Sequence, residues 1–123
     1  MRNLPRDGAP ERAVASGNFH REVFVSIPLG GRLVEGFIDL LFEESDGLVI
    51  VDYKTDSIKA ADVEKAKGAH EVQVGLYTLA AREATGKTVH EAVLLFLRPN
   101  AEYRFLDIDA LDARAMEAAS AIH

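Results

Sequence analysis

The segment GFIDLLFEESDGLVIVDYKTD, residues 36–56, places two acids and a lysine among apolar residues. Asp39 and Asp52 each stand in a run of Phe, Ile, Leu and Val, and Lys54 follows Asp52 closely. Two carboxylates that share a site either trap a proton or need a cation. A hard cation such as Mg²⁺ suits them, because it takes oxygen ligands from carboxylates and from a substrate phosphate. A nearby lysine could orient or deprotonate a metal-bound water and offset phosphate charge, which is the chemistry of phosphodiester hydrolysis.

The elements that must position these residues are three predicted strands. Residues 20–29 alternate in polarity and end at a Gly-Gly pair that indicates a hairpin turn. Residues 32–43 form the second strand, ESDG forms the next turn, and residues 48–55 form a short β-branched third strand. We therefore expect a three-stranded antiparallel meander, with the two acids on its second and third strands.

The register of the second turn decides whether the acids meet. If Ser45 and Asp46 are its two central residues, Asp39 lies directly opposite Asp52. If Asp46 and Gly47 are central, Asp39 lies opposite Lys54 instead. Both registers gather the three residues on one face, whereas a three-residue loop would separate them.

Alternation along the strands adds an expectation about faces. In the third strand it places Asp52 and Lys54 on one face with Leu48 and Ile50. In the second strand it places Asp39 on the face of Phe37 and Leu41.

In the second half of the chain, the spacing of the apolar residues changes from alternation to a helical repeat. Residues 61–84 repeat apolar positions at helical spacing, 90–99 and 102–108 are strand-like, and a final Ala-rich helix follows with Asp109 as its N-cap. The predicted order is βββ-α-β-β-α, an α/β (α+β) fold with a mixed sheet flanked by helices. Residues 1–18 show no clear helix, so we interpret them as a flexible leader or linker remnant, with the domain at 19–123.

Composition narrows the class of protein. A chain of 123 residues with 48% hydrophobic residues is expected to be one globular domain. It has no cysteine, which fits a reducing, cytoplasmic setting, and no apolar run long enough to span a membrane. A formal net charge of −6 argues against a free-standing domain that binds nucleic acid tightly.

Three motifs resemble those of the PD-(D/E)XK nuclease superfamily, in particular the RecB-like domain at the C-terminus of bacterial helicase–nucleases of the RecB and AddA type. They are GFIDLLF, VDYKTD and, on the predicted helix, QVGLY at residues 73–77. The resemblance implies a restriction-endonuclease-like fold. It further implies metal ligation by Asp39, Asp52 and the backbone carbonyl of Tyr53, and catalysis by Lys54. Gln73 and Tyr77 would line the site and contact DNA or order the catalytic groups.

The sequence also departs from this family. Its members usually carry a metal-binding histidine on a helix before the first strand, and residues 1–18 contain no histidine. His20 opens the first predicted strand, which is the wrong place for that ligand, and we interpret it as a surface residue. Glu22, on the same predicted strand, is likewise assigned no role in the site.

The resemblance implies a Mg²⁺- or Mn²⁺-dependent deoxyribonuclease of exonuclease type, within a DNA repair or recombination helicase–nuclease. Its partners would be DNA and a helicase motor domain or subunit upstream, and a homodimer could form through an exposed strand edge. The alternative is a non-catalytic scaffold or DNA-channelling module, a truncated fragment inactive alone. Strand polarity and the choice between exo- and endonuclease action stay open.

Overall fold

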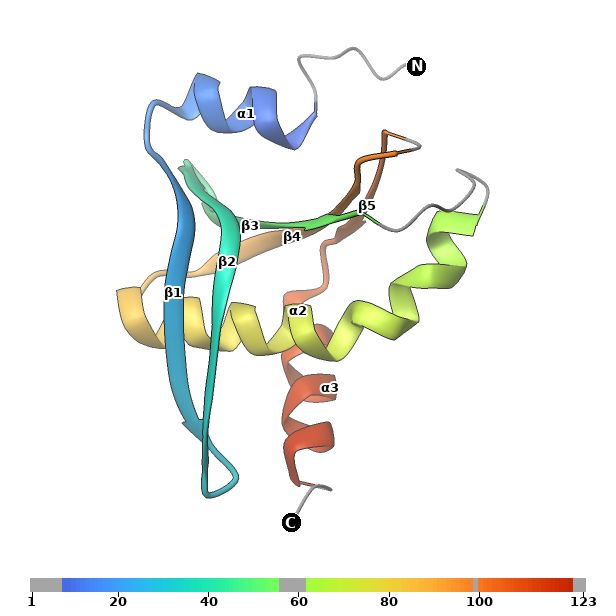
Figure 1. Ribbon diagram of the computed structural model, residues 1–123. Helices are drawn as coiled ribbons and strands as arrows, with labels where there is room; N and C mark the ends of the chain where they lie inside the picture. The colour runs from blue at the N-terminus through green and yellow to red at the C-terminus, as the bar shows by residue number, and fades with distance from the viewer. Residues whose placement is uncertain (1–7, 56–61, 99, 121–123) are drawn as a thin grey trace.

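A mixed β-sheet forms the centre of the computed structural model, which describes residues 8–55, 62–98 and 100–120 (Figure 1). Five strands lie in chain order across it: β1 (Phe19–Leu29), β2 (Arg32–Glu44), β3 (Gly47–Lys54), β4 (Val89–Phe96) and β5 (Ala101–Phe105). β3 and β4 are parallel, and the other neighbouring pairs are antiparallel. The predicted βββ-α-β-β-α order is confirmed, although the predicted start of its first helix at residue 61 lies outside the described residues.

Helices cover both faces of the sheet. α2 (Val63–Thr85) and α3 (Ile108–Ser120) cover one face, where the core includes Ile50 and Leu94. α1 (Ala9–Ser16) covers part of the other face, above Leu40, Phe42, Val49 and Val51. Because both faces of β3 and β4 are buried, continuous apolar runs form the middle of each strand, residues 48–51 and 92–96, as is typical of central parallel strands. A polar residue in β3 is therefore conspicuous.

Helix α1 corrects the expectation that residues 1–18 contain no helix. The helix begins with a proline in its first turn, where the missing N–H is harmless, and ends at Gly17, whose φ of 70° is left-handed. Only Ala9 and Ala13 are buried on its inner side, so its apolar periodicity is too weak to predict from sequence. The division of the chain at residues 18 and 19 into a leader and a domain stays a prediction.

Charge anchors α1 to the sheet. The Arg12 guanidinium donates to Glu44 at 2.7 and 3.0 Å and to Glu91 at 2.8 and 2.9 Å. These bonds, with Glu91 the stronger partner, raise the pKa of Arg12 above its ordinary value. At the start of the helix, the N–H of Ala9 donates to Glu102 at 2.7 Å. Since Glu91 is only 5% exposed, Arg12 neutralises a carboxylate that water scarcely reaches.

The start of α3 also differs from the prediction. The helix begins at Ile108, and Asp107 rather than Asp109 caps it by accepting the N–H of Ala110 at 3.1 Å. Asp109 lies inside the first turn, where a negative charge still favours the positive end of the helix.

A bend interrupts β1 and β2 near the middle of their length. Arg21 pairs with Leu40 and Val23 with Ile38, but the ladder skips the intervening pair, Glu22 and Asp39. Side-chain alternation shifts there, because Ile38 joins the core under α2 whereas Leu40 joins the core under α1. The expectation that Asp39 shares one face with Phe37 and Leu41 was therefore wrong, since Phe37 is 57% exposed while Leu41 is buried under α2.

Candidate active site

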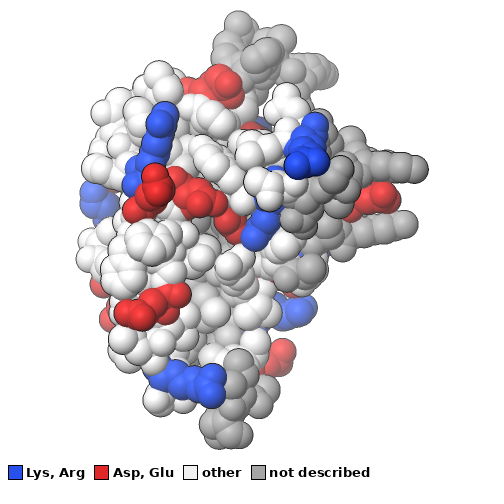
Figure 2. Space-filling model, viewed as in Figure 1, with Lys and Arg blue, Asp and Glu red and all other residues white. Residues whose placement is uncertain are grey.

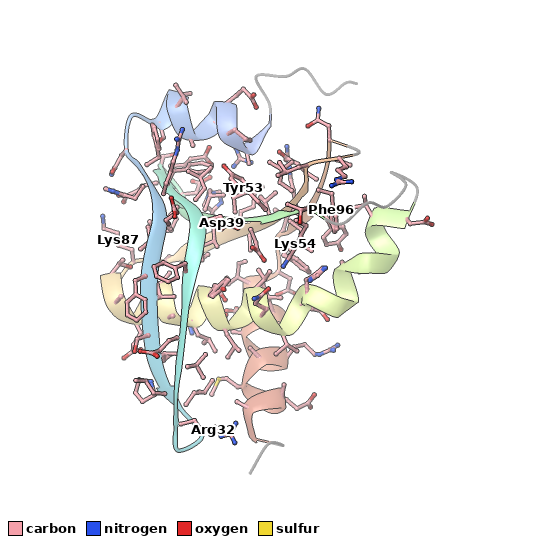
Figure 3. The ribbon with its side chains drawn as sticks, in the orientation of Figure 1. Arg32, Asp39, Tyr53, Lys54, Lys87 and Phe96 are labelled. Atoms are coloured by element: carbon pink, nitrogen blue, oxygen red, sulfur yellow. The ribbon has the colours of Figure 1, made fainter. Side chains whose placement is uncertain are left out.

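Asp39 and Asp52 lie opposite one another, as the first of the two predicted registers requires. Glu44 pairs with Gly47 and Leu40 pairs with Val51, so Ser45 and Asp46 are the central turn residues. Continued by one residue pair beyond Leu40 and Val51, the same register places Asp39 opposite Asp52. The Asp39 carboxylate accepts the backbone N–H of Tyr53 at 2.7 Å, which joins the middle of β2 to the end of β3 (Figure 3).

Asp52 is an acid buried in the sheet. It is 6% exposed, and burial raises its pKa to about 6, with a further rise from the neighbouring Asp39 carboxylate and a partial offset by Lys54. Lys54 Nζ lies 3.0 Å from Asp52 Oδ2 as an ion pair. Within the described part of the chain, no donor makes a well-directed hydrogen bond to that oxygen. A buried carboxylate oxygen that accepts no well-directed hydrogen bond can still bind a further positively charged partner.

Lys54 is held by a short chain of side chains from helix α2. Its Nζ donates to Gln73 Oε1 at 3.0 Å, and Gln73 Nε2 donates to the Tyr77 hydroxyl at 3.5 Å. Gln73 and Tyr77 are one helical turn apart, so they present the same face of α2. Burial, followed by the Asp52 and Asp39 carboxylates, raises the pKa of Tyr77. The structure thus brings together all five side chains selected from the sequence, and their roles in catalysis stay predictions.

Gly36 allows Tyr77 to reach this position. A Cβ at residue 36 would lie 2.8 Å from Tyr77 Cε1 and 2.9 Å from its hydroxyl oxygen. These distances are shorter than van der Waals contact, so the bare backbone of β2 is what the tyrosine packs on. The glycine of the first motif and the tyrosine of the third are therefore in direct contact.

Replacing Gly36 by alanine is expected to destabilise the domain by about 1–3 kcal/mol, the usual range for overpacking, because the new methyl overlaps the tyrosine ring. Thermal unfolding of Gly36→Ala measures this, and Tyr77→Leu in the same chain should restore most of the loss. Gly68→Ala is the matched control, since a Cβ there meets no atom within 4 Å and alanine favours a helix. Equal stability of Gly36→Ala and wild type would contradict the contact.

The residues present fit a hard divalent cation. Asp39 and Asp52 supply carboxylate oxygens from neighbouring strands, and the Asp52 oxygen without a hydrogen bond is what such an ion would satisfy. Lys54 remains beside it to oppose negative charge. Ligation by the Tyr53 carbonyl stays a prediction. Helix α1 contains no histidine, so the described upstream helix supplies no imidazole ligand.

A second polar cluster was not predicted from the sequence. Ligand atoms of Glu44, His90 and Glu91 lie within 4.8 Å of one another. Arg12 already binds both carboxylates, and we interpret this cluster as the anchor of α1 rather than a metal site. No short sequence pattern could have indicated it, because Glu44 of β2 lies far along the chain from His90 and Glu91 of β4.

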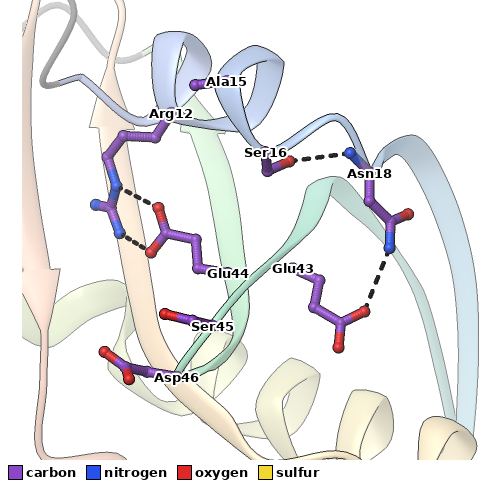
Figure 4. A pocket seen from close by; sticks show the side chains of 8 residues that line it. All are labelled: Arg12, Ala15, Ser16, Asn18, Glu43, Glu44, Ser45 and Asp46. Atoms are coloured by element: carbon purple, nitrogen blue, oxygen red, sulfur yellow. Dashed lines mark hydrogen bonds and ion pairs between the residues drawn. The ribbon is translucent and has the colours of Figure 1, made fainter.

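A surface hollow of about 710 Å³ lies between α1 and the β2–β3 turn (Figure 4). Its acids are largely paired: Glu44 binds Arg12, and Glu43 accepts from Asn18 at 3.3 Å and Lys87 at 2.8 Å. None of the five side chains of the candidate active site lines it. The hollow therefore has no part in the chemistry of Asp52 and Lys54.

The fold and the site together define a class of protein. The model of the PD-(D/E)XK nuclease superfamily matches residues 4–121, and the chain belongs to that family. Over 106 residues, 73% of this chain, it is 40% identical to an ATP-dependent helicase/nuclease subunit from Thermoanaerobacter sp. (strain X514). It is 34% identical over 100 residues to the protein of the same name from Clostridium botulinum (strain 657 / Type Ba4). The chain spans 9% and 8% of these two relatives.

A solved structure agrees with the fold. A candidate exonuclease from Eubacterium rectale aligns with 89% of this chain and 44% of its own, with a TM-score of 0.57 and 16% identity. The predicted restriction-endonuclease-like sheet is thereby confirmed. Among the helices described, none is both long and apolar enough to cross a membrane.

Proposed function

We propose that this chain is a metal-dependent deoxyribonuclease domain that hydrolyses phosphodiester bonds. The observation that carries the proposal is the buried Asp52 oxygen, which has an ion-pair partner in Lys54 but no hydrogen bond among the described groups, and which lies in register with Asp39. A sheet stabilised for its own sake has no use for two facing acids of which one is buried, because the Asp52 carboxylate must lose its hydration beside the half-buried Asp39.

The residues have distinct tasks in this mechanism. Asp39 and Asp52 would hold Mg²⁺ or Mn²⁺, with the Tyr53 carbonyl as a further ligand. The ion, when bound, supplies Lewis-acid chemistry that activates water and neutralises phosphate charge. Lys54 offsets the negative charge that builds up on the phosphate and helps to orient the attacking water. Gln73 and Tyr77 keep the Lys54 ammonium in place through the hydrogen bonds described above.

The relatives suggest the setting of this reaction. Their name combines a helicase with a nuclease, so we propose DNA as the substrate and an ATP-driven helicase motor, in the cytoplasm, as the partner that delivers it. This would explain why a nuclease domain can carry a net charge of −6, since the domain need not hold the strand alone. Exonuclease action and pairing of two copies through the β1 or β5 edge belong to the same set of proposals.

A non-catalytic scaffold or DNA-channelling module is the second candidate. The absence of histidine from α1 favours it, because such a metal site would lack one ligand that the family resemblance implies. The retained Asp39, Asp52 and Lys54 favour the nuclease.

Lys54→Met is expected to lower DNA hydrolysis at least about 100-fold while leaving divalent-metal binding within a few-fold, since it removes the charge that faces the phosphate but no metal ligand. Calorimetric titration with Mg²⁺ and Mn²⁺ and cleavage of end-labelled DNA measure the two effects. Lys87→Met is the control, because Lys87 is a surface residue paired with Glu43. Absence of binding at millimolar metal in the wild type would favour the scaffold.

A further inference from the structure

The outer face of the β1–β2 hairpin carries two exposed phenylalanines. Phe24 and Phe37 are direct cross-strand partners, and they are 54% and 57% exposed. Their neighbours along the strands, Val25 and Ile38, point to the opposite face and join the core under α2. Alternation therefore turns both rings away from α2 and into solvent.

The two rings leave aromatic surface uncovered. Their centroids are 5.4 Å apart and their planes meet at 63°, so they contact edge to face rather than stacking flat on one another. Pro28 and Leu33, paired nearer the tip of the hairpin, continue the apolar surface on the same side, and Leu33 is 61% exposed. Adjoining exposed apolar residues of this kind are typical of a surface that binds something.

This aromatic pair lies beside the candidate active site. Phe37 precedes Asp39 by two residues, about 7 Å along β2, and one residue pair separates the phenylalanines from the bend. In Figure 3, aromatic rings stand on this hairpin close to the labelled Asp39. Figure 2, in the same view, shows uncharged surface over the hairpin directly below a row of acidic side chains. A phosphate held at Asp39 would bring the adjoining nucleotides within reach of the rings.

Charge decides which part of a nucleotide this surface can take. Glu35 is exposed on the next outward-facing pair, and Glu22 is exposed at the bend. These acids disfavour a phosphate over the rings, whereas a base is neutral and can stack on an exposed aromatic side chain. A basic, apolar protein segment is the other occupant that would suit this charge. The position beside Asp39 favours the base.

We propose that Phe24 and Phe37 form a stacking platform for an unpaired nucleobase of the strand that is cut at Asp39 and Asp52. The proposal rests on the proposed function, because it places the cut strand on this face. Stacking tolerates any sequence, since every base has a π-face, and it needs no positive charge on the protein. A chain with a net charge of −6 would thereby hold DNA in a way that phosphate contacts do not provide.

Fluorescence anisotropy tests the platform, with a fluorescein-labelled oligothymidylate in low-salt buffer containing EDTA, so that no strand is cut. The double variant Phe24→Leu, Phe37→Leu is expected to bind this strand at least about fivefold more weakly, because it stays apolar but loses both rings. An abasic strand of the same length should bind the wild type and this variant equally.

Two further variants serve as controls. Phe24→Tyr, Phe37→Tyr keeps both rings and should bind the oligothymidylate as the wild type does. Phe19→Leu removes a ring of the same strand that is 37% exposed and lies under the Arg21 guanidinium, away from the pair; it should leave binding unchanged. Thermal unfolding of each variant checks that the fold is retained.

Cleavage of the oligothymidylate with Mn²⁺ separates this proposal from the proposed function. Binding that depends on both the rings and the bases, without cleavage by the wild type, would overturn the nuclease and support a platform on a DNA-channelling module. Cleavage by the wild type, with equal binding by the wild type and the leucine variant, would overturn the platform alone. Equal weakening on the normal and abasic strands would also overturn it, since the rings would then serve the fold or a protein contact. No binding of the oligothymidylate by the wild type would overturn it as well.

Discussion

Replacing Asp52 by asparagine is expected to abolish DNA hydrolysis while making the metal-free domain more stable. Activity should fall at least about 1,000-fold, because the variant loses a metal ligand and with it several kcal/mol of charge stabilisation. Stability should rise by about 2 kcal/mol at pH 7, because the buried carboxylate, whose pKa is raised to about 6, no longer has to be ionised in the folded state. Opposite signs for activity and stability are the signature of a functional buried acid.

The pH dependence of the free energy of unfolding provides a second test of Asp52→Asn. In the unfolded chain the pKa of the Asp52 carboxyl is near its ordinary value of 3.8, and in the fold it is about 6. Above pH 6 the group is ionised in both states and its full penalty is present; below pH 4 it is protonated in both and the penalty is gone. As the pH falls from about 6 to about 4, this group therefore stabilises the fold, and Asp52→Asn should lack that gain.

Chemical denaturation across this pH range measures the difference between wild type and variant, which cancels the other carboxylates. Asp46→Asn is the matched control, because it makes the same change of charge at an exposed turn position. If Asp52→Asn is no more stable than the wild type at pH 7, ionisation of the buried Asp52 carboxylate does not destabilise the fold.

Arg12→Met should give the largest loss of stability on the α1 side of the sheet, about 3 kcal/mol. Removing one partner from a buried ion pair leaves a poorly compensated charge. Here that charge is on Glu91, which is 5% exposed and whose other ion-pair partner among the described residues, Arg104, is 3.7 Å away. Glu44, whose pKa Arg12 lowers, would lose the same partner. The inner side of α1 would then have little beyond Ala9 and Ala13 to bind it to the sheet.

Urea unfolding of Arg12→Met measures this loss, and the triple variant Arg12→Met, Glu44→Gln, Glu91→Gln should recover most of it, because no charge is then stranded. Arg114→Met is the control for removing an arginine, since Arg114 pairs with Glu71 and is itself 56% exposed; it should cost less than about 1 kcal/mol. If Arg12→Met costs no more than Arg114→Met, charge does not anchor the helix.

The central sheet could be predicted from sequence because its signals are local. The turn Glu44–Gly47 fixes the β2–β3 register, and a fixed register is enough to bring Asp39 opposite Asp52. The spacing of Gln73 and Tyr77 on a helix likewise predicts a shared face. The meeting of Asp39, Asp52 and Lys54 follows from patterns of a few residues. That Gln73 and Tyr77 join them was implied only by the family resemblance, because the spacing on a helix does not say what its face packs against.

Features that depend on distant partners could not be predicted in this way. Helix α1 has a weak apolar pattern, and its binding depends on Arg12 reaching Glu44 and Glu91, far along the chain. The bend at Glu22 breaks the strict alternation on which strand faces were predicted. The cap of α3 was placed two residues late because either of two nearby acids, Asp107 or Asp109, satisfies the sequence preference.

The contact between Gly36 and Tyr77 also limits how relatives of this chain can diverge. A side chain at position 36 and a tyrosine at position 77 compete for the same space, so neither position can drift independently of the other. Alanine or serine at position 36 would force the ring at position 77 to move, shrink or be removed, and the hydroxyl that Gln73 approaches would shift or be lost with it. Two motifs in different elements, far apart in the chain, are thus subject to a single steric constraint.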